Sequence, residues 1–477
     1  MGLAVSGPLE QLVYGYNHVV LAYFALMNLM YLALLYHAAR AMLDRVQRGR
    51  MEAIDDLLRS PLAPGVTVVV PAFNEQECIV ESVRSLLALR YPRFQVIVVS
   101  DGSTDETVAR LEREFALERF PRVYVPGIST APVRRVLRSR DEPRLLVAEK
   151  VNGGKADALN CGINLADEEL VCAIDADAIL DADALLLSCR PFVEQPDEVI
   201  GTGGIVRIAN GCRIEQGRVE EVALPRSGLA AIQVVEYLRA FLTARAGWSR
   251  VNALLIVSGA FGVFRRDVVR EVGGYRVDTV GEDGELVVRL HRAMRDAGRR
   301  YRITFVPDPV CWTEAPESLA VLRRQRNRWQ RGLAEILWFH RDMVGRGRYG
   351  AVGLLALPAA IAFELLGPVV ELTGIAAVAA GWYLHLLSVR FMVAFMLVSL
   401  VFGLFLSVTA LALEEASLQR YPRLRQLAGL VVYSVLEQLG YRQLTAMWRL
   451  RALLQALRSK HRGHWGAMDR RGLVRGR

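Results

Sequence analysis

Long apolar segments flank a middle region of mixed character. Between Glu10 and Arg40 the chain has no Asp, Glu, Lys or Arg, and residues 16–36 are almost wholly apolar. An α-helix needs about 20 apolar residues to cross a bilayer, so we predict a membrane-spanning helix here. Basic residues follow directly, at Arg40, Arg45, Arg48 and Arg50. By the positive-inside rule, the N-terminus is expected outside and the next domain in the cytoplasm.

A second apolar region covers residues 351–413 and is interrupted only by Glu364, Glu371 and Arg390. It is long enough for two or three crossings, and its two prolines predict a bent or interfacial piece. Glu364 and Glu371 are seven residues apart and therefore share a helix face. They either pair with Arg390 and neighbouring helices or line a polar path for a sugar chain.

The last apolar segment, residues 427–439, is short and has arginines on both sides, so its topology stays open. From Tyr441 to Arg477 there are ten basic residues and one acidic residue, a surplus equal to the net charge of +9 of the whole chain. Beside apolar segments, such a tail favours a cytoplasmic membrane surface over nucleic acid. The six cysteines show no zinc-ligand spacing, and we expect them to be buried thiols in a reducing compartment.

Between the apolar regions, short β-type runs alternate with amphipathic helical runs. The expected buried strands are residues 66–70, 95–99, 145–148 and 170–174, and the expected helices include 75–89, 104–115 and 156–165. Strands that alternate with helices predict an α/β domain with a largely parallel sheet, whose ligands bind beyond the carboxyl ends of the strands. Polar clusters follow each strand: Asn74 and Glu75, then Asp101, then residues 150–155, then Asp175 and Asp177.

Two of these clusters suit a nucleotide diphosphate. Asp175 and Asp177 are hard oxygen ligands of the kind that hold Mg²⁺ or Mn²⁺ on phosphates. A calcium loop is excluded because its glycine position is Leu180, and Asp181 is expected to cap the next helix. The glycine-rich turn before Lys155 lacks the Ser or Thr of a Walker A motif. Lys155 is therefore either a phosphate or ribose contact or a surface residue at a helix start.

Two later motifs stand on predicted helices. Gly281, Glu282 and Asp283 open an amphipathic helix, where acidic residues also serve as ordinary helix caps. Gln325, Arg326, Arg328 and Trp329 fall within a basic amphipathic helix over residues 319–339. Such a helix is expected on the membrane surface, with arginines among the headgroups. This placement also allows Arg328 and Trp329 to face the site.

The motifs together resemble those of processive family 2 glycosyltransferases, the bacterial cellulose, hyaluronan, chitin and poly-N-acetylglucosamine synthase group. The resemblance rests on six motifs in the family's order: Pro71-Ala-Phe-Asn-Glu75, Ser100-Asp-Gly-Ser-Thr-Asp105, Asn152-Gly-Gly-Lys155, Asp175-Ala-Asp177, Gly281-Glu-Asp283 and Gln325-Arg-Asn-Arg-Trp329. It implies a GT-A fold and a UDP-sugar donor. One departure is Gly281, where the family usually has Thr.

The resemblance also implies a role for each motif residue. Asp283, with Glu282 beside it, matches the general base, and Asp177 matches the metal ligand for Mg²⁺ or Mn²⁺. The nucleotide-sugar would be bound by Pro71, Phe73, Glu75, Asp101, Lys155, Asp175 and Arg328. The acceptor would meet Gly259, Gln325 and Trp329.

These inferences predict the following division of the chain: a transmembrane helix in residues 1–40, a cytosolic linker in 41–63, a GT-A catalytic domain in 64–315, an interfacial helix in 316–346, transmembrane or interfacial helices in 347–442 and a basic cytosolic tail in 443–477. The expected protein is a multi-pass inner-membrane glycosyltransferase that moves a hexose or N-acetylhexosamine from a UDP-sugar to a growing β-linked polysaccharide. Its partners would be the donor, the polysaccharide, membrane lipid and export or regulatory subunits, with no nucleic acid. The alternatives are a non-processive transferase acting on a lipid carrier and a non-catalytic membrane subunit.

Overall fold

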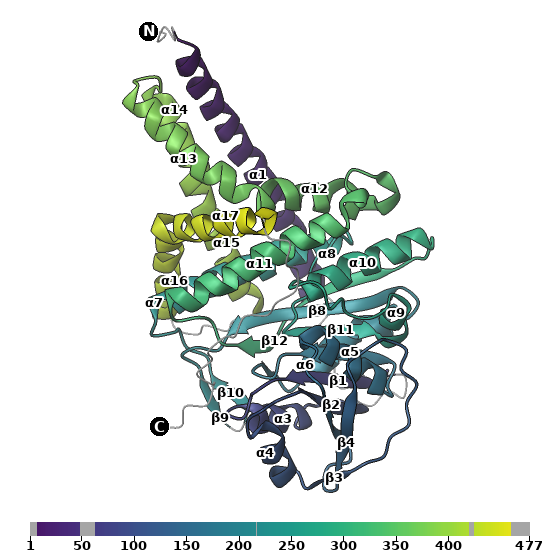
Figure 1. Cartoon of the computed structure of the whole chain (residues 1–477). Helices are drawn as coiled ribbons and strands as arrows, with labels where there is room; N and C mark the ends of the chain where they lie inside the picture. Colours follow the sequence, from purple (N-terminus) through teal and green to yellow (C-terminus); the bar gives the residue numbers. More distant parts are fainter. Residues whose placement is uncertain (1–6, 48–62, 216, 419–423, 459–477) are drawn as a thin grey trace.

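The computed structural model describes residues 7–47, 63–215, 217–418 and 424–458. A bundle of long helices stands at one end of the molecule, and an α/β domain fills the other (Figure 1). This arrangement confirms the predicted α/β class with apolar helices on both sides in sequence. The expected linker after Gln47 and the tail beyond Arg458 lie outside the described residues.

Four parallel strands form the half of the sheet that the sequence predicts. They are β1 (Val66–Ala72), β2 (Phe94–Asp101), β5 (Leu145–Lys150) and β6 (Leu170–Ile174), in the order β5-β2-β1-β6. Helices α3 (Ile79–Leu87), α4 (Thr107–Glu114) and α5 (Lys155–Leu165) follow the first three of them. The strands are buried almost throughout, which is why they read as continuous apolar runs.

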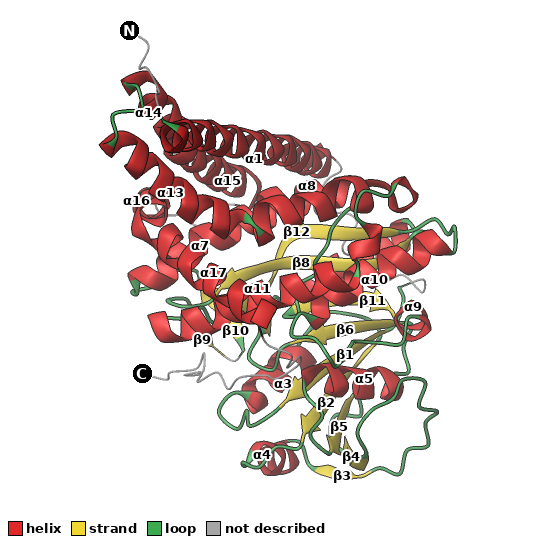
Figure 2. Ribbon diagram, turned by 45° about the horizontal axis from the view of Figure 1, so that its top comes forward, coloured by secondary structure: helices red, strands yellow, loops and turns green. Residues whose placement is uncertain are grey.

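The sheet continues with strands of mixed direction toward the helical bundle (Figure 2). The added strands are β11 (Phe261–Arg265), β8 (Val199–Ile208), β12 (Arg302–Thr313) and β7 (Ile179–Leu180), and at the far edge β4 (Val133–Ser139) and β3 (Leu117–Arg119). Strand β11 runs antiparallel to β6 and β8, so the sheet is less uniformly parallel than predicted. A separate hairpin joins β9 (Arg213–Glu215) and β10 (Arg218–Glu221).

Among the described residues, six further helices complete the domain: α6 (Ala184–Glu194), α7 (Gly228–Arg239), α8 (Ala246–Arg250), α9 (Arg266–Glu271), α10 (Glu282–Asp296) and α11 (Leu319–Phe339). The π-helix η1 (Ala240–Arg245) lies between α7 and α8.

The prediction that Asp181 caps α6 is wrong. The residue before the helix is Asp183, and Asp181 instead accepts a hydrogen bond from Nε1 of the fully buried Trp312 at 2.8 Å.

Within the described residues, two helices are long and apolar enough to cross a membrane. One is Pro8–Asp44, within α1 (Pro8–Gln47), and the other is Val389–Glu415, built from α14 (Val389–Met396), η6 (Leu397–Val401) and most of α15 (Phe402–Leu418). A third candidate is the pair Val352–Leu365 and Gly367–Tyr383, bent by 45° where Pro368 follows the break. The predicted prolyl bend is thus present.

Shorter helices link α11 to this region and end the described chain. They are η2 (Arg341–Met343), η3 (Gly347–Tyr349), η4 (Val352–Ala356), α12 (Leu357–Ala359), η5 (Ala360–Leu365), α13 (Gly367–Tyr383), α16 (Leu424–Leu436), η7 (Glu437–Tyr441) and α17 (Arg442–Arg458). Helix α17 lies beside α11 (Figure 1) and also contacts α13, so the first part of the predicted basic tail is an ordered helix. Its Arg442 pairs with Glu371 at 3.1 Å, so this glutamate faces a neighbouring helix, as one of the predicted alternatives had it.

Ion pairs join the helical bundle to the α/β domain. Arg207 of β8 pairs with Glu414 of α15, and both side chains are at most 2% exposed. Arg239 of α7, which is partly exposed, pairs with the buried Glu437 at 2.5 Å. Glu414 neutralises an arginine that would otherwise be an isolated charge in a dry environment.

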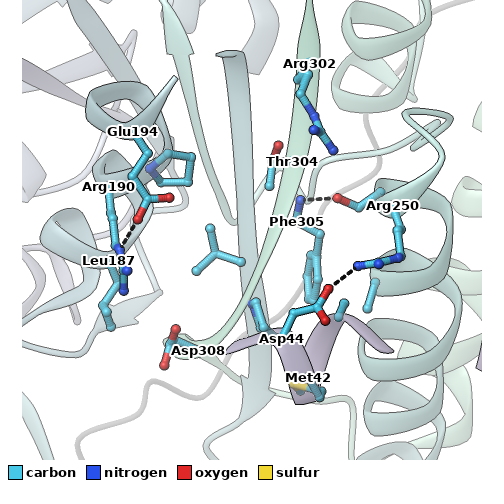
Figure 3. A pocket seen from close by; sticks show the side chains of 16 residues that line it. Met42, Asp44, Leu187, Arg190, Glu194, Arg250, Arg302, Thr304, Phe305 and Asp308 are labelled. Carbon is cyan, nitrogen blue, oxygen red and sulfur yellow. Dashed lines mark hydrogen bonds and ion pairs between the residues drawn. The ribbon is translucent and has the colours of Figure 1, made fainter. Parts of the chain in front are cut away.

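A cavity of about 240 Å³ lies where the end of α1 meets α6, α8 and β12 (Figure 3). Ion pairs stand on two of its sides, Asp44 with Arg250 at 2.7 Å and Arg190 with Glu194 at 2.5 Å. None of the residues predicted for the active site lines this cavity.

Replacing Glu414 with Gln is expected to lower stability, because Arg207 would stay buried without a counter-charge. The cost of breaking such a pair is about 3–5 kcal/mol, which a thermal unfolding scan in detergent would detect as a fall in Tm. Glu194→Gln is the control, since its ion pair is solvent-exposed and is expected to contribute less than about 1 kcal/mol. Equal Tm values for the two variants would contradict the account.

Candidate active site

The predicted site residues between Pro71 and Asp177 lie at the carboxyl ends of four neighbouring parallel strands. Ala72 of β1 is paired with Ser100 of β2, and Asp101 is paired with Lys150 of β5. Strand β6 lies on the other side of β1 in parallel register, so Asp175 emerges at the same edge. The predicted convergence of these strand ends is therefore observed.

Lys155 gathers the acidic residues of two distant segments. Its Nζ lies 2.5 Å from Asp175 Oδ1 and 3.6 Å from Glu282 Oε1. Asp283 is held by two backbone amides, since Gly259 N donates to its Oδ2 at 2.9 Å and Gly284 N to its Oδ1 at 2.8 Å. A Cβ at Gly259 would stand 3.1 Å from Lys155 Nζ and 3.2 Å from Asp283 Oδ2. Gly259 therefore lets the backbone pass close beneath the charged groups.

Burial and charge oppose each other in this cluster. Burial lowers the pKa of Lys155, but Asp175 and Glu282 outweigh it and raise that pKa to about 12. Glu282 is 5% exposed, and burial raises its pKa to about 7, with Lys155 opposing the shift and Asp283 adding to it. Lys155 is thus a permanent cation among carboxylates and is no surface residue.

Asp101 organises the glycine-rich turn from the neighbouring strand end. Its carboxylate accepts hydrogen bonds from Gly153 N at 2.9 Å, from Gly154 N at 2.7 Å and from Lys150 Nζ at 2.6 Å. Lys150 is fully buried and also pairs with Asp157 at 2.6 Å. The sequence prediction gave Lys150 no role of its own, although a lysine that ends an apolar strand indicates a buried carboxylate partner.

The loop after β1 lies beside this turn and is partly exposed to solvent. Pro71 lies in β1, and the ring of Phe73 after it is 51% exposed. Asn74 has a φ of 56° and accepts a hydrogen bond from Thr104 N at 2.8 Å, while Glu75 N donates to Thr107 Oγ1 at 2.9 Å. These bonds tie the loops after β1 and β2 together, as one nucleotide site built from both would require.

Helix α11 supplies an aromatic wall. Trp329 is 42% exposed, and its ring centroid lies 6.4 Å from that of Tyr237 on α7. Arg326 makes two hydrogen bonds of 2.7 Å to Glu236 and so fixes α11 to α7. Gln325 is buried, Arg328 is half-buried, and Tyr237 is a neighbour of Trp329 that the sequence did not indicate. The exposed ring of Trp329, with polar groups beside it, is suited to packing against a sugar.

A divalent cation fits the donor chemistry of this edge. Asp175 and Asp177 present carboxylate oxygens, the hard ligands that Mg²⁺ and Mn²⁺ prefer. Across the part of the chain that the structure describes, no group of three or more His, Cys, Asp and Glu side chains is arranged to hold a metal ion. A diphosphate would therefore have to complete the coordination shell, as is usual for Mg²⁺.

The glycine that departs from the family motif has a steric reason. A Cβ on Gly281 would lie 3.0 Å from Gly332 Cα and 3.2 Å from Ile336 Cδ1, both on α11. The hydroxyl of Thr279, two residues earlier, accepts a hydrogen bond from Gly281 N at 3.1 Å. The chain thus has a threonine near the helix start, while Gly281 permits close packing of α10 on α11.

Gly281→Thr, which restores the usual family residue, is expected to destabilise the protein and reduce any activity of this site. The added atoms have to push α11 away, an overpacking cost of about 1–3 kcal/mol. Thermal unfolding in detergent would measure it against Gly347→Thr, where a Cβ meets nothing within 4 Å. Full stability in Gly281→Thr would contradict the close contact.

Glu282→Gln is expected to change stability in a pH-dependent way. The pKa of Glu282 in the folded protein, about 7, exceeds the ordinary value of 4.5. Between these two values the folded state keeps a proton that the unfolded state loses, so the stability of the wild type falls as the pH rises from 4.5 to about 7. Glutamine avoids that loss, so the variant's Tm relative to wild type should be higher at pH 8 than at pH 5. Exposed Glu271 gives the control, Glu271→Gln. A difference independent of pH would refute the assignment.

Two family models match consecutive parts of this domain. "Glycosyl transferase family 2" matches residues 67–126, and "Glycosyltransferase like family 2" matches residues 123–332. Among solved structures, the mannosyltransferase PcManGT from Pyrobaculum calidifontis in complex with GDP-Man and Mn²⁺ covers 87% of this chain and 99% of its own, at 20% identity and a TM-score of 0.48. S. aureus TarS 1-349 in complex with UDP-GlcNAc covers 80% and 92%, at 16% identity and a TM-score of 0.36.

The curated relatives share more sequence. The poly-beta-1,6-N-acetyl-D-glucosamine synthase of Staphylococcus epidermidis is 29% identical over 273 residues, and that of Staphylococcus aureus (strain COL) is 30% identical over 273 residues. The match takes in 57% of this chain but spans only 55% of the length of these relatives. Residues 67–332 therefore form a family 2 glycosyltransferase domain, in a chain homologous to the poly-beta-1,6-N-acetyl-D-glucosamine synthases.

Proposed function

We propose that this protein is a membrane-embedded, inverting glycosyltransferase that extends a β-linked polysaccharide from a UDP-sugar. The observation that carries the proposal is the meeting of Lys155, Asp175, Glu282 and Asp283 at one sheet edge. A cation among carboxylates, next to a glycine-rich turn, is an arrangement suited to a diphosphate and to proton transfer.

Asp283 is the proposed general base. Its carboxylate takes the proton of the acceptor hydroxyl while that oxygen forms a bond to the anomeric carbon. The bond from this carbon to the diphosphate breaks at the same time, and UDP leaves with the electron pair. Single displacement inverts the configuration, so an α-linked donor gives a β-linked product. The amides of Gly259 and Gly284 orient the base before the acceptor binds.

The leaving group is held by the strand ends. Asp101 and its glycine turn, with Pro71, Phe73 and Glu75, form the proposed nucleotide site. Lys155 and Arg328 would face the diphosphate, Asp175 would lie beside the nucleotide, and Asp177 would hold Mg²⁺ or Mn²⁺. Such an ion offsets the negative charge that develops on the departing phosphate.

The acceptor is proposed to lie against Trp329 and Gln325. Helix α11 packs on α17, which also contacts α13 of the helical bundle. Together with the candidate membrane helices, these contacts support a polymer that is passed toward the membrane over a soluble acceptor. We propose a multi-pass protein of the inner membrane with a cytoplasmic catalytic domain. N-acetylglucosamine is the favoured sugar because the relatives are named for a polymer of it.

The direct test is UDP release by detergent-purified protein with Mg²⁺ or Mn²⁺. UDP-N-acetylglucosamine, UDP-glucose, UDP-galactose and UDP-glucuronate are offered separately, each with a radiolabelled sugar. The expected result is UDP release from UDP-N-acetylglucosamine with a labelled product of high molecular weight. A single sugar on extracted lipid would favour the non-processive alternative. Absence of both UDP release and nucleotide binding would favour a non-catalytic subunit.

Asp283→Asn tests the base in the same assay. Loss of general-base catalysis is expected to lower kcat by about 10²–10⁴-fold while UDP binding stays near wild type. Asp278→Asn, on the same loop but half exposed and paired with Arg276, is the matched control. Near-normal turnover in Asp283→Asn would show that another group is the base.

A further inference from the structure

The loop that precedes the proposed base is hydrogen-bonded to α11. Thr279 Oγ1 donates to Glu335 Oε2 at 2.8 Å, and Val280 N donates to the same oxygen at 3.0 Å. Thr279 Oγ1 in turn accepts from Gly281 N at 3.1 Å. One carboxylate oxygen of α11 therefore binds two successive residues directly, and a third through the Thr279 hydroxyl, just before Glu282 and Asp283.

Glu335 is itself held in place. Arg331, one turn earlier on α11, donates from Nε to Glu335 Oε1 at 2.9 Å. The side chain of Glu335 is 11% exposed, and Thr279 is 4% exposed. Hydrogen bonds between such poorly solvated groups are stronger and better defined than exposed ones.

Close backbone packing also holds the start of α10 against α11. Gly281 and Gly332 approach so closely that a Cβ on either would lie 3.0 Å from the Cα of the other. A Cβ on Gly284 would meet Ile336 Cδ1 at 2.8 Å. The start of α10 therefore has almost no freedom to slide along α11.

The same helix carries the proposed acceptor wall. Trp329 precedes Glu335 by six residues, a distance of about 9 Å along the axis at 1.5 Å per residue. Gln325 and Arg328 lie on the preceding turns of α11. The helix thus connects the surface on which a sugar would rest to the loop that orients the proposed base.

We propose that Thr279 and Glu335 are positioning residues that set the distance between Asp283 and the acceptor wall of α11. This inference rests on the proposed function, because it assigns the pair a role in that reaction. Neither side chain touches the substrate. Their effect is on the geometry in which the acceptor hydroxyl meets the base, and small displacements of such groups reduce turnover strongly.

The decisive variants are Thr279→Val, which removes the hydroxyl at nearly constant volume, and Thr279→Ser, which retains it. Thr279→Val is expected to lower kcat by about tenfold, the effect of one well-placed interaction, with the donor KM within about twofold of wild type. Thr279→Ser should restore kcat to within about twofold of wild type. Glu335→Met removes the acceptor for both donors and should lower kcat at least as much as Thr279→Val.

Asp342→Asn is the matched control. Asp342 also bridges to α10, through Arg292 at 2.7 Å, but it lies just beyond the far end of α11 and does not touch the loop before the base. Its kcat and KM should stay within about twofold of wild type. Hydrogen exchange should be faster at residues 280–284 in Thr279→Val and unchanged there in Asp342→Asn.

The outcomes distinguish a failure of the positioning role of Thr279 and Glu335 from a failure of the proposed function. Wild type that turns over no donor defeats the proposed function and, with it, the role given to this pair. If wild type is active and Thr279→Val has an unchanged kcat, only the positioning role of Thr279 and Glu335 is overturned. A rise in donor KM without a change in kcat would also overturn it, since the pair would then act on nucleotide binding.

Discussion

The contact between Lys155 and its carboxylate neighbours determines how this site is assembled. Asp175 follows β6, whereas Glu282 and Asp283 open α10 more than 100 residues later, and their charges repel one another. The ammonium group between them offsets that repulsion at short range. Burial, with a smaller contribution from Asp283, still raises the pKa of Glu282 to about 7. A bound cation or a change in protonation would relieve the repulsion further, so a cluster of this kind is poised for ligand and proton chemistry.

Ion pairs attach the α/β domain to the helical bundle. The ion pairs Arg207–Glu414 and Arg239–Glu437 fix β8 and α7 to the last helices, and Arg326 holds α11 to α7 through Glu236. Trp329 consequently has a defined place relative to both the membrane helices and the strand ends. In the proposed function, this arrangement would bring the acceptor surface of α11 close to the bilayer.

Much of the fold could be predicted because its core strands are buried on both faces. Such strands read as uninterrupted apolar runs, as in Val66–Ala72, and their polar ends mark the edge where ligands bind. Strand β8 was harder, since its sequence contains three glycines, which have low β-propensity. The direction of β11 could not be read at all, because alternation of apolar residues carries no information on pairing.

The site was predictable residue by residue only where motifs mark it. The gathering of Lys155, Asp175, Glu282 and Asp283 followed from strand ends and the family resemblance. The pairing of Thr279 with Glu335 did not, because the partners are 56 residues apart and depend on the packing of α10 against α11. The basic residues at the end of the chain indicated a membrane surface, but their charge alone could not show that α17 is ordered against α11 and α13.

The most direct test of the central claim is an experimental structure of the protein with UDP-N-acetylglucosamine and Mn²⁺, with manganese located by its anomalous scattering. The account predicts manganese bound by Asp177 and the diphosphate, uracil beside Asp101 and the sugar between Lys155 and Asp283. A nucleotide bound away from these strand ends, or manganese remote from Asp175 and Asp177, would contradict it.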